Sequence, residues 1–392
     1  MKLHIYTRFF IFVFTLSIVS TSNNLISQVL FKIPSKDTTT RISPIKELQN
    51  DLESIISDND FSDAFIGVSI IAPEQNEILY QKNENKNFVP ASNQKILTTA
   101  TALRYLGADY KFQTKMYLDG EVNDNGEFLG DIYIRGFGDP SLSDYFYTDP
   151  YKIFEYFKKC LDSLGIKSIQ GDIIGDDNFF DDAFYSPGWQ IDDINYNYSA
   201  QINALSILDN KVDITVVSGS SINHLASINI YPVTKYIKVT NNVITSIPSS
   251  AVDINAVREP CTNNIIVFGT IPYDSLQKNE NKISVTIENP TMYFLYLFKE
   301  YLERNKIAHQ GALTDIDETG FLPDYSTIEK SFTFFSPKLS EIIKVINRES
   351  HNLAAEMLLK TIGRETSGFG STVKGTELVE KYLAKIGINI KR

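Results

Sequence analysis

The sequence predicts an α+β protein in which a long strand-rich segment interrupts a domain that carries most of the helices. Apolar residues recur at helical spacing in six stretches: 45–56, 92–107, 291–305, 339–347, 352–363 and 372–387. From Tyr110 to about Pro290, short β-prone runs separated by turn residues dominate instead. We therefore expect residues 45–110 and 290–392 to form one domain, and residues 111–289 to be a β-rich insertion of one or two subdomains.

The first part of the domain is predicted to contain a helix, a hairpin and a second helix. Ile45–Ile56 has an amphipathic pattern, and Ala64–Ala72 and Glu77–Gln81 are β-prone runs on either side of a turn at 73–76. The second helix starts near Ser92 and ends at Gly107, since glycine is common at helix C-termini.

The insertion is predicted to hold eight strands and one helix, Tyr151–Leu164. The strands are Gln113–Leu118, Gly130–Arg135, Ser168–Gly175, Val212–Val217, Ser227–Ile230, Tyr236–Val239, Ile265–Phe268 and Ile283–Ile287. The helix at Thr291–Asn305 that follows the insertion carries many aromatic residues. At helical spacing such a stripe is more typical of a packed core than of a ligand site.

The N-terminus has the pattern of a secretion signal, which we place at residues 1–28 and follow with a polar linker at 29–44. Lys2 and Arg8 give a positive start, and Phe9–Val19 is an apolar run too short for a confident membrane span. We expect export across the inner membrane to the periplasm or cell envelope. An uncleaved anchor is the alternative, and peripheral membrane association stays open.

Composition excludes several classes of function. A net charge of −11, with no basic stripe, argues against nucleic-acid binding. The cysteines, Cys160 and Cys261, allow one disulfide or two buried free thiols. The four histidines show no metal-ligand spacing, so a cysteine or zinc hydrolase is disfavoured. Nothing in the sequence indicates the oligomeric state.

Ser92 and Lys95 are the most informative pair in the sequence. They stand three residues apart at a helix start, so their side chains share one face of the first turn. The helix N-terminus and partial burial both disfavour a protonated amine, so Lys95 can lose its proton near neutral pH and accept one from Ser92. A serine beside an amine base can act as an acyl-transfer nucleophile.

The Ser-x-x-Lys pattern alone is weak, because it also starts at Ser43, Ser275 and Ser371. Ser92 is distinguished by the extended segment before it and by the apolar helical stripe behind it. The alternative is that Ser92 only caps the helix.

Ser350 and Asn352 form a second polar pair, on a predicted short loop between helices. In an acyl-transfer site, the hydroxyl could shuttle a proton and the amide could hold the substrate. The alternative is that Ser350 or Asn352 caps the following helix, with Glu356 in its early turns. Ser-x-Asn is a common pattern and recurs in this chain at Ser22, Ser57, Ser221 and Ser227.

The order of these segments resembles a known family. PASNQK (90–95), the long insertion and ESHNLAAEMLLK (349–360) are similar to the D-alanyl-D-alanine carboxypeptidases of the class C low-molecular-mass penicillin-binding proteins. GDIYIRGFGDPSLS (130–143) resembles that family's Gly-Asp-Pro loop, and segments 171–182, 188–210 and 290–303 also agree. The resemblance covers roughly residues 45–390.

The resemblance implies a serine transpeptidase/β-lactamase-like fold, with an antiparallel sheet flanked by helices. It implies that Ser92 is acylated, that Lys95 is its base, and that Ser350 and Asn352 complete the catalytic set. His351 fills a variable position and receives no role. The implied substrates are peptidoglycan peptides ending in D-Ala-D-Ala, with cross-links as further substrates of an endopeptidase activity. The implied inhibitors are β-lactams, and no metal or organic cofactor is implied.

One element of the family pattern is not found. The 392 residues contain no Lys-Thr-Gly, the third motif of such enzymes. Lys374-Gly375-Thr376 has the letters in another order and lies in a helical stretch. We therefore expect the catalytic domain to be C-terminally incomplete in this sequence, and the 392-residue chain to be a poor enzyme and a poor penicillin binder.

Three functions remain open at this point. The leading interpretation is a secreted serine-type D-Ala-D-Ala carboxypeptidase, with or without endopeptidase activity. The second is a truncated or inactive homologue that acts only as a cell-wall binding scaffold. The third, a β-rich adhesion module, is disfavoured by the ordered run of matched segments.

Overall fold

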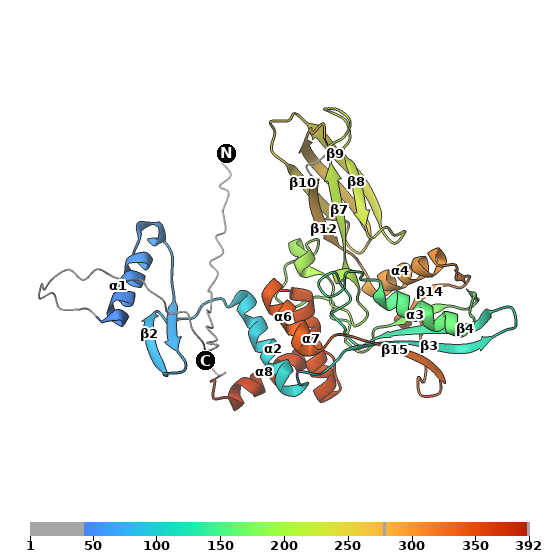
Figure 1. Cartoon of the computed structure of the whole chain (residues 1–392), viewed down its shortest axis with the longest axis horizontal. Helices are drawn as coiled ribbons and strands as arrows, with labels where there is room; N and C mark the ends of the chain where they lie inside the picture. The colour runs from blue at the N-terminus through green and yellow to red at the C-terminus, as the bar shows by residue number, and fades with distance from the viewer. Residues whose placement is uncertain (1–42, 277–279, 390–392) are drawn as a thin grey trace, which may run out of the picture. The chain divides into compact units, whose positions relative to one another are not determined.

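The computed structural model describes residues 43–276 and 280–389 (Figure 1). The predicted signal peptide and nearly all of the predicted linker lie outside these residues. The chain forms two compact units, one ending at Val89 and one starting at Pro90. None of the helices in the described ranges is both long enough and apolar enough to cross a membrane.

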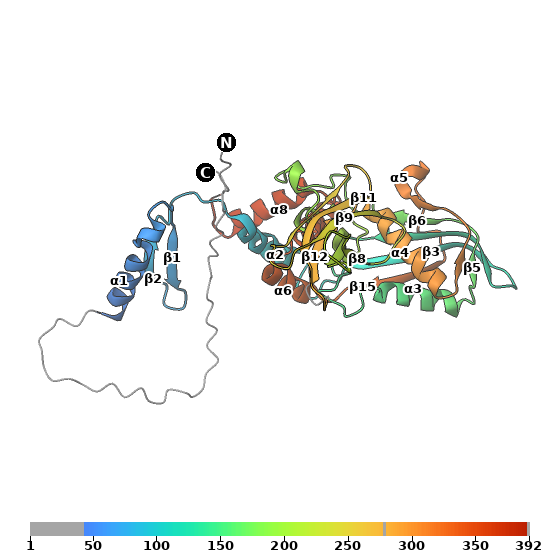
Figure 2. The same cartoon turned by 90° about the horizontal axis from the view of Figure 1, so that it is seen from above.

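The first unit consists of a helix and a β-hairpin (Figure 2). Its elements are α1 (Pro44–Ile56), the 3-10 turn η1 (Asn59–Phe61), β1 (Val68–Ala72) and β2 (Glu77–Lys82). The helix starts where predicted because the Ser43 hydroxyl caps it. Glu53 ties the helix to the hairpin, since its carboxylate accepts hydrogen bonds from Tyr80 and Lys82 of β2.

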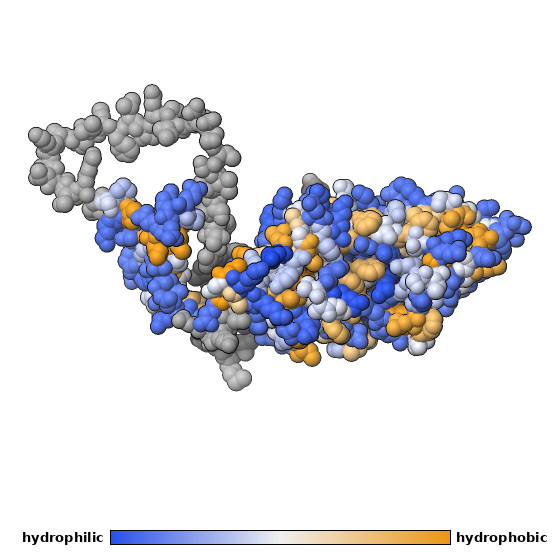
Figure 3. Space-filling view, turned by 90° about the horizontal axis from the view of Figure 1, so that it is seen from below, coloured by the Kyte–Doolittle hydropathy of each residue, from blue (hydrophilic) through white to orange (hydrophobic). Residues whose placement is uncertain are grey.

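The hairpin is antiparallel, and among the described residues it is the only sheet of this unit. No side chain of α1 is buried, and Ile55, Ile71 and Ile78 are more than half exposed. Figure 3 shows hydrophobic residues at the surface of this unit. The predicted hairpin is therefore present. Within this unit, apolar side chains of both the helix and the hairpin remain exposed.

Four helices of the second unit pack together. They are α2 (Gln94–Tyr105), α6 (Leu339–Glu349), α7 (Asn352–Ser367) and α8 (Thr372–Lys385). Their shared core includes Ala102, Ile346 and Leu358. Gly375 lies in α8, where a Cβ atom would stand only 2.2 Å from the backbone oxygen of Leu359 on α7. The Lys374-Gly375-Thr376 segment is thus helical, as predicted, and its glycine allows close helix packing.

A seven-stranded mixed sheet forms the other end of this unit (Figure 1). Its strands are β3 (Gln113–Val122), β4 (Glu127–Gly136), β5 (Ser168–Ile169), β6 (Ile173–Asp176), β13 (Ala308–His309), β14 (Leu313–Asp315) and β15 (Lys330–Phe335). Helices α3 (Lys152–Ser163) and α4 (Pro290–Arg304) pack with it, and α5 (Ile316–Thr319) adds one turn. Phe154 and Phe294 meet edge to face with ring centres 5.0 Å apart. The aromatic stripe of α4 is therefore largely core, as predicted.

Two three-stranded sheets of the second unit are both formed by residues of the predicted insertion. Their orders are β10-β11-β9 and β12-β7-β8. The strands are β7 (Lys211–Val217), β8 (Ser227–Tyr231), β9 (Lys238–Ser246), β10 (Asp253–Arg258), β11 (Asn264–Pro272) and β12 (Glu280–Thr286). Val212, Ile214, Val243 and Val267 are fully buried in the core that these sheets share with the large sheet.

The structure corrects several predicted strand boundaries. The single strand expected at 168–175 is two short strands with a break that contains Gly171, where a Cβ atom would collide with the backbone oxygen of Gly130 at 2.2 Å. The strand expected at 236–239 starts at Lys238 and continues to Ser246. Strands β10, β13, β14 and β15 were not predicted, because their apolar patterns are short. The pairing partners of β13, β14 and β15 also lie far away in the chain, whereas β10 pairs with the next strand, β11.

Candidate active site

Ser92 lies at the entrance to α2, as predicted. The 3-10 turn η2 (Ala91–Asn93) follows Pro90 and leads directly into the helix. Pro90 and Asn93 hold the N-cap positions of these two segments without a side-chain capping bond. The exposed Ser92 hydroxyl instead accepts a hydrogen bond from the Lys95 amine at 3.0 Å. The predicted contact is present, and the alternative that Ser92 is a helix cap is wrong.

Ser350 and Asn352 lie at the tight junction between α6 and α7. Ser350 ends α6 in the left-handed conformation, with φ 55° and ψ 41°, and Asn352 is the first residue of α7. The residue between them, His351, is the N-cap: its Nδ1 accepts a hydrogen bond from the backbone N–H of Ala354 at 3.1 Å. The capping role considered for Ser350 or Asn352 therefore belongs to His351, which leaves both neighbouring side chains free to face α2.

The four residues predicted from the sequence meet at the Lys95 amine. Besides Ser92, the amine contacts Ser350 Oγ at 3.3 Å and Asn352 Oδ1 at 2.5 Å. The Asn352 amide in turn donates to the backbone oxygen of Tyr198, at 2.9 Å. These three acceptors match the three N–H donors of an ammonium group. A nucleophile candidate, an amine and two polar groups thus form one cluster at the junction of α2 and α7.

The surroundings of Lys95 shift its pKa downward. Partial burial lowers the pKa of Lys95 below its ordinary value of 10.5, while the Glu356 carboxylate, one turn along α7 from Asn352, raises it and partly offsets the effect. Burial in turn raises the pKa of Glu356 above its ordinary value. An amine with a lowered pKa is available as a base closer to neutral pH.

Sequence reasoning missed three groups beside the cluster: Tyr198, Asp209 and the side chain of His351. Tyr198 and Asp209 lie in the segment 188–210, which was recognised only as a match in sequence. Its contacts with α7 join residues more than 140 positions apart. No local pattern encodes a pairing at that distance.

Other polar groups of the described chain lie outside this cluster. Asp177, Asp315 and Asp317 place carboxylate oxygens within 4.8 Å of one another, but Asp177 and Asp315 accept hydrogen bonds from Asn203, Thr291 and Asn289. Cys160 is half-buried and Cys261 exposed, and both are free thiols. The disulfide considered from the sequence is therefore not formed, and only Cys160 is even partly buried.

Comparison with known proteins covers the whole second unit and most of the described residues of the first. Residues 48–392 match the D-Ala-D-Ala carboxypeptidase 3 (S13) family. The D-alanyl-D-alanine carboxypeptidase of Actinomadura sp. (strain R39) is 30% identical over 350 residues, which cover 88% of this chain and 62% of that protein. The penicillin-sensitive carboxypeptidase A of Dictyostelium discoideum is 26% identical over 92% of this chain and 73% of its own length.

The fold is that of penicillin binding protein 4 (DacB) from Haemophilus influenzae, whose crystal structure superposes with a TM-score of 0.68 at 21% identity, over 83% of this chain and 68% of that one. This likeness confirms the predicted α+β fold with its β-rich insertion. The chain thus spans 62–73% of the length of these three relatives. Since the model of this family matches residues 48–392, the chain belongs to the D-Ala-D-Ala carboxypeptidase 3 (S13) family.

Proposed function

We propose that the protein is a serine-type D-Ala-D-Ala carboxypeptidase that acts on peptidoglycan stem peptides through an acyl-enzyme on Ser92. The observation that carries the proposal is the Lys95 amine, which lies 3.0 Å from the Ser92 hydroxyl and also contacts Ser350 and Asn352. The relatives named as D-alanyl-D-alanine and penicillin-sensitive carboxypeptidases support the choice of substrate and of β-lactams as inhibitors.

The proposed reaction has two steps. In the first, Ser92 Oγ attacks the carbonyl carbon between the two D-alanines while Lys95 takes the hydroxyl proton. The C–N bond then breaks, and the proton returns through the Ser350 hydroxyl to the departing amine of D-alanine. In the second, water attacks the ester carbonyl while Lys95 takes its proton. The C–O bond to Ser92 then breaks, and Lys95 returns the proton to Ser92 Oγ, which leaves the shortened peptide as a carboxylic acid. Asn352 holds the substrate amide. With a cross-linked peptide the same steps would release the cross-linking amine, which is the endopeptidase reaction.

Covalent labelling with a fluorescent penicillin tests the proposal. The full chain is incubated with the probe beside Ser92→Ala and beside Ser275→Ala, which removes the serine of another Ser-x-x-Lys match. We expect an adduct on the tryptic peptide that contains Ser92, retained in Ser275→Ala and lost in Ser92→Ala. A label that persists in Ser92→Ala, or folded wild-type protein with no adduct on Ser92, would contradict the proposal.

The labelling rate separates this function from a second candidate, a homologue that binds the cell wall without catalysis. The 392 residues contain no Lys-Thr-Gly, which favours slow labelling because a substrate or penicillin carboxylate would lack that motif's charge-assisted contact. Rapid stoichiometric labelling supports the enzyme and shows that this motif is dispensable. Binding to purified peptidoglycan that is equal in wild type and Ser92→Ala, without D-alanine release, supports the scaffold.

The proposed location is the cell envelope. The basic, apolar and small-residue pattern of residues 1–28 supports export across the inner membrane into the periplasm. Fractionation of cells that express the full chain, with mass spectrometry of its N-terminus, tests this. A mature N-terminus near residue 29 in the envelope fraction is expected, and an intact Met1 in the cytoplasmic fraction would contradict it.

A further inference from the structure

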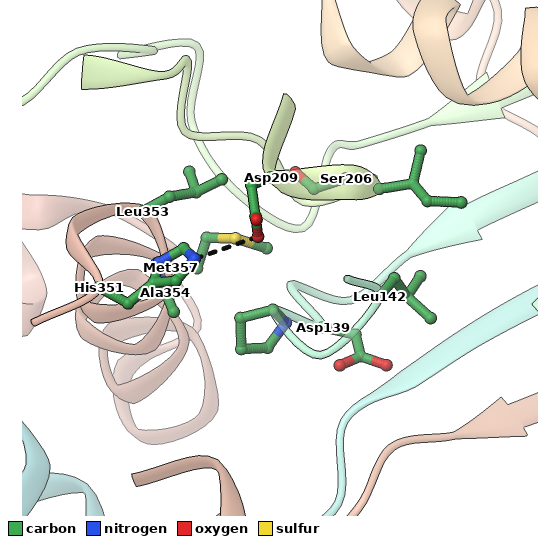
Figure 4. A pocket seen from close by; sticks show the side chains of 10 residues that line it. Asp139, Leu142, Ser206, Asp209, His351, Leu353, Ala354 and Met357 are labelled. Carbon is green, nitrogen blue, oxygen red and sulfur yellow. Dashed lines mark hydrogen bonds and ion pairs between the residues drawn. The ribbon is translucent and has the colours of Figure 1, made fainter. Parts of the chain in front are cut away.

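His351 connects the second polar pair to the β-rich insertion. Figure 4 shows its ring pointing from the start of α7 toward Asp209, with the dashed line marking their contact. His351 Nε2 lies 3.1 Å from Asp209 Oδ1, and each side chain is only about one-tenth exposed, at 10% and 11%. The two residues line a small pocket beneath the start of α7 together with Asp139 and Leu353.

The two hydrogen bonds of the ring determine its tautomer. A backbone N–H can only donate, so Nδ1 must accept from Ala354 and carries no proton. The ring proton therefore sits on Nε2 and is donated to the Asp209 carboxylate. Hydrogen bonds at both nitrogens, and the edge-to-face contact with Tyr145 at 5.2 Å between ring centres, hold the imidazole in one orientation.

Asp209 is itself rigidly placed. It lies in the turn η5 (Leu208–Asn210), whose three residues all adopt positive φ, between 52° and 55°. The Asn210 side chain holds this turn by donating to Gln201 O at 2.8 Å and to Ser206 Oγ at 2.9 Å. Residues in such rare backbone conformations persist only where the surrounding structure holds them, and they are common at functional sites.

We propose that the Asp209–His351 pair is the device by which the insertion positions Ser350 and Asn352 around Lys95. His351 is the residue between them, so fixing its backbone and ring fixes the direction of both neighbours. The hydrogen bond from the Asn352 amide to Tyr198 O is a second contact between the insertion and the junction of α6 and α7. His351 and Asp209 are thus positioning residues. Their catalytic relevance rests on the proposed function, whereas their contact does not.

The contact is tested by nitrogen-15 NMR of histidine-labelled full chain, a readout independent of activity. The His351 signal is identified by its loss in His351→Asn, a variant that keeps a good N-cap residue. We expect the Nε2–H tautomer in wild type, and the same tautomer in Asp209→Ala with a shifted Nε2 signal, because the Ala354 N–H still donates to Nδ1 while the Nε2–H has lost its acceptor. An Nδ1–H tautomer, or an Asp209→Ala spectrum identical to wild type, would overturn the pairing even if Ser92 reacts as proposed.

The positioning role is tested by the rate at which penicillin acylates Ser92. Asp209→Ala and His351→Asn should each slow acylation about tenfold, and the double variant should be no slower, because the two residues act as one unit. Asp209→Asn keeps an oxygen that can accept from His351 and should recover most of the rate. Asp144→Asn, which removes an exposed carboxylate nearby, is the control for charge.

Unchanged acylation rates in folded variants with lowered melting temperatures would show that the pair has only a structural role. Wild-type protein that labels elsewhere than Ser92 would instead refute the proposed function.

Discussion

The Lys95 amine lies 2.5 Å from the side-chain oxygen of Asn352, although 257 positions separate the two residues in the chain. The contact joins the first turn of α2 to the first residue of α7. The same amine also contacts the Ser92 hydroxyl in η2 and the Ser350 hydroxyl at the end of α6, so substitutions in several segments can change the pKa of Lys95. The first two predictions use that dependence.

Asn352→Asp should slow acylation at neutral pH. The substitution keeps an oxygen beside the Lys95 amine but adds a negative charge, which favours the protonated amine and raises its pKa. One unit of pKa corresponds to about a tenfold smaller fraction of neutral amine. We therefore expect acylation by penicillin to slow about tenfold at pH 7 and to recover as the pH rises. Asn347→Asp on α6, whose side chain hydrogen bonds with Thr99, is the matched control. Equal pH profiles for wild type and Asn352→Asp would contradict the base role of Lys95.

Glu356→Gln should move the same pH profile in the opposite direction. The Glu356 carboxylate raises the pKa of Lys95, so removing its charge should lower that pKa further. The acylation rate should rise with pH as Lys95 loses its proton, and in wild type we expect the midpoint of this rise below pH 10.5. In Glu356→Gln the midpoint should lie at a still lower pH. Glu365→Gln, further along α7 where it accepts from Tyr110, should leave the midpoint unchanged. A shift to higher pH in Glu356→Gln would show that another group titrates.

Lys360→Ala should destabilise the second unit. The Lys360 side chain is fully buried in α7, and its amine donates to the Asp181 carboxylate at 2.6 Å and to the backbone oxygen of Ala183 at 2.8 Å. Removing it leaves a cavity and unpaired acceptors, and Asp181 is exposed enough to recover some hydration. We expect a loss of about 2–3 kcal/mol in the free energy of unfolding, measured in urea. Lys374→Ala removes an exposed ion pair with Glu377 and should cost less than about 0.5 kcal/mol.

Asp139→Asn should stabilise the protein above pH 6. Burial raises the pKa of this carboxyl to about 6 from 3.8, so the folded state binds more protons than the unfolded state between these values. Wild-type stability should therefore fall as the pH rises through that window, by about 3 kcal/mol in total. Asparagine cannot ionise, and its oxygen can still accept from the Ser141 N–H as Asp139 does.

The measurement is the difference in unfolding free energy between Asp139→Asn and wild type. It should be close to zero near pH 4 and approach about 3 kcal/mol at pH 8. Asp124→Asn, in an exposed turn, should show no such pH dependence. A difference that shrinks with rising pH would mean that the Asp139 carboxylate is stabilised in its charged form.

Much of the local structure followed from the sequence. Capping residues and apolar spacing predicted α1, α3, α4 and α7 to within a few residues at most ends, because helix periodicity and caps are encoded within a single turn. The strands were less well predicted. β15 was missed, since its hydrogen-bonded partner β3 lies about two hundred positions earlier in the chain.

The candidate site shows the same difference between local contacts, which the sequence predicts, and long-range contacts, which it does not. The sequence by itself determined the contact between Ser92 and Lys95, because residues three apart in a helical turn must share a face. It also supplied Ser350 and Asn352 as candidates. Only the tertiary structure decided that both converge on Lys95, that His351 is the cap, and that Asp209 and Tyr198 hold the junction. Those contacts depend on how α2, α7 and the insertion pack, and packing between distant segments is set by the whole core rather than by any local pattern.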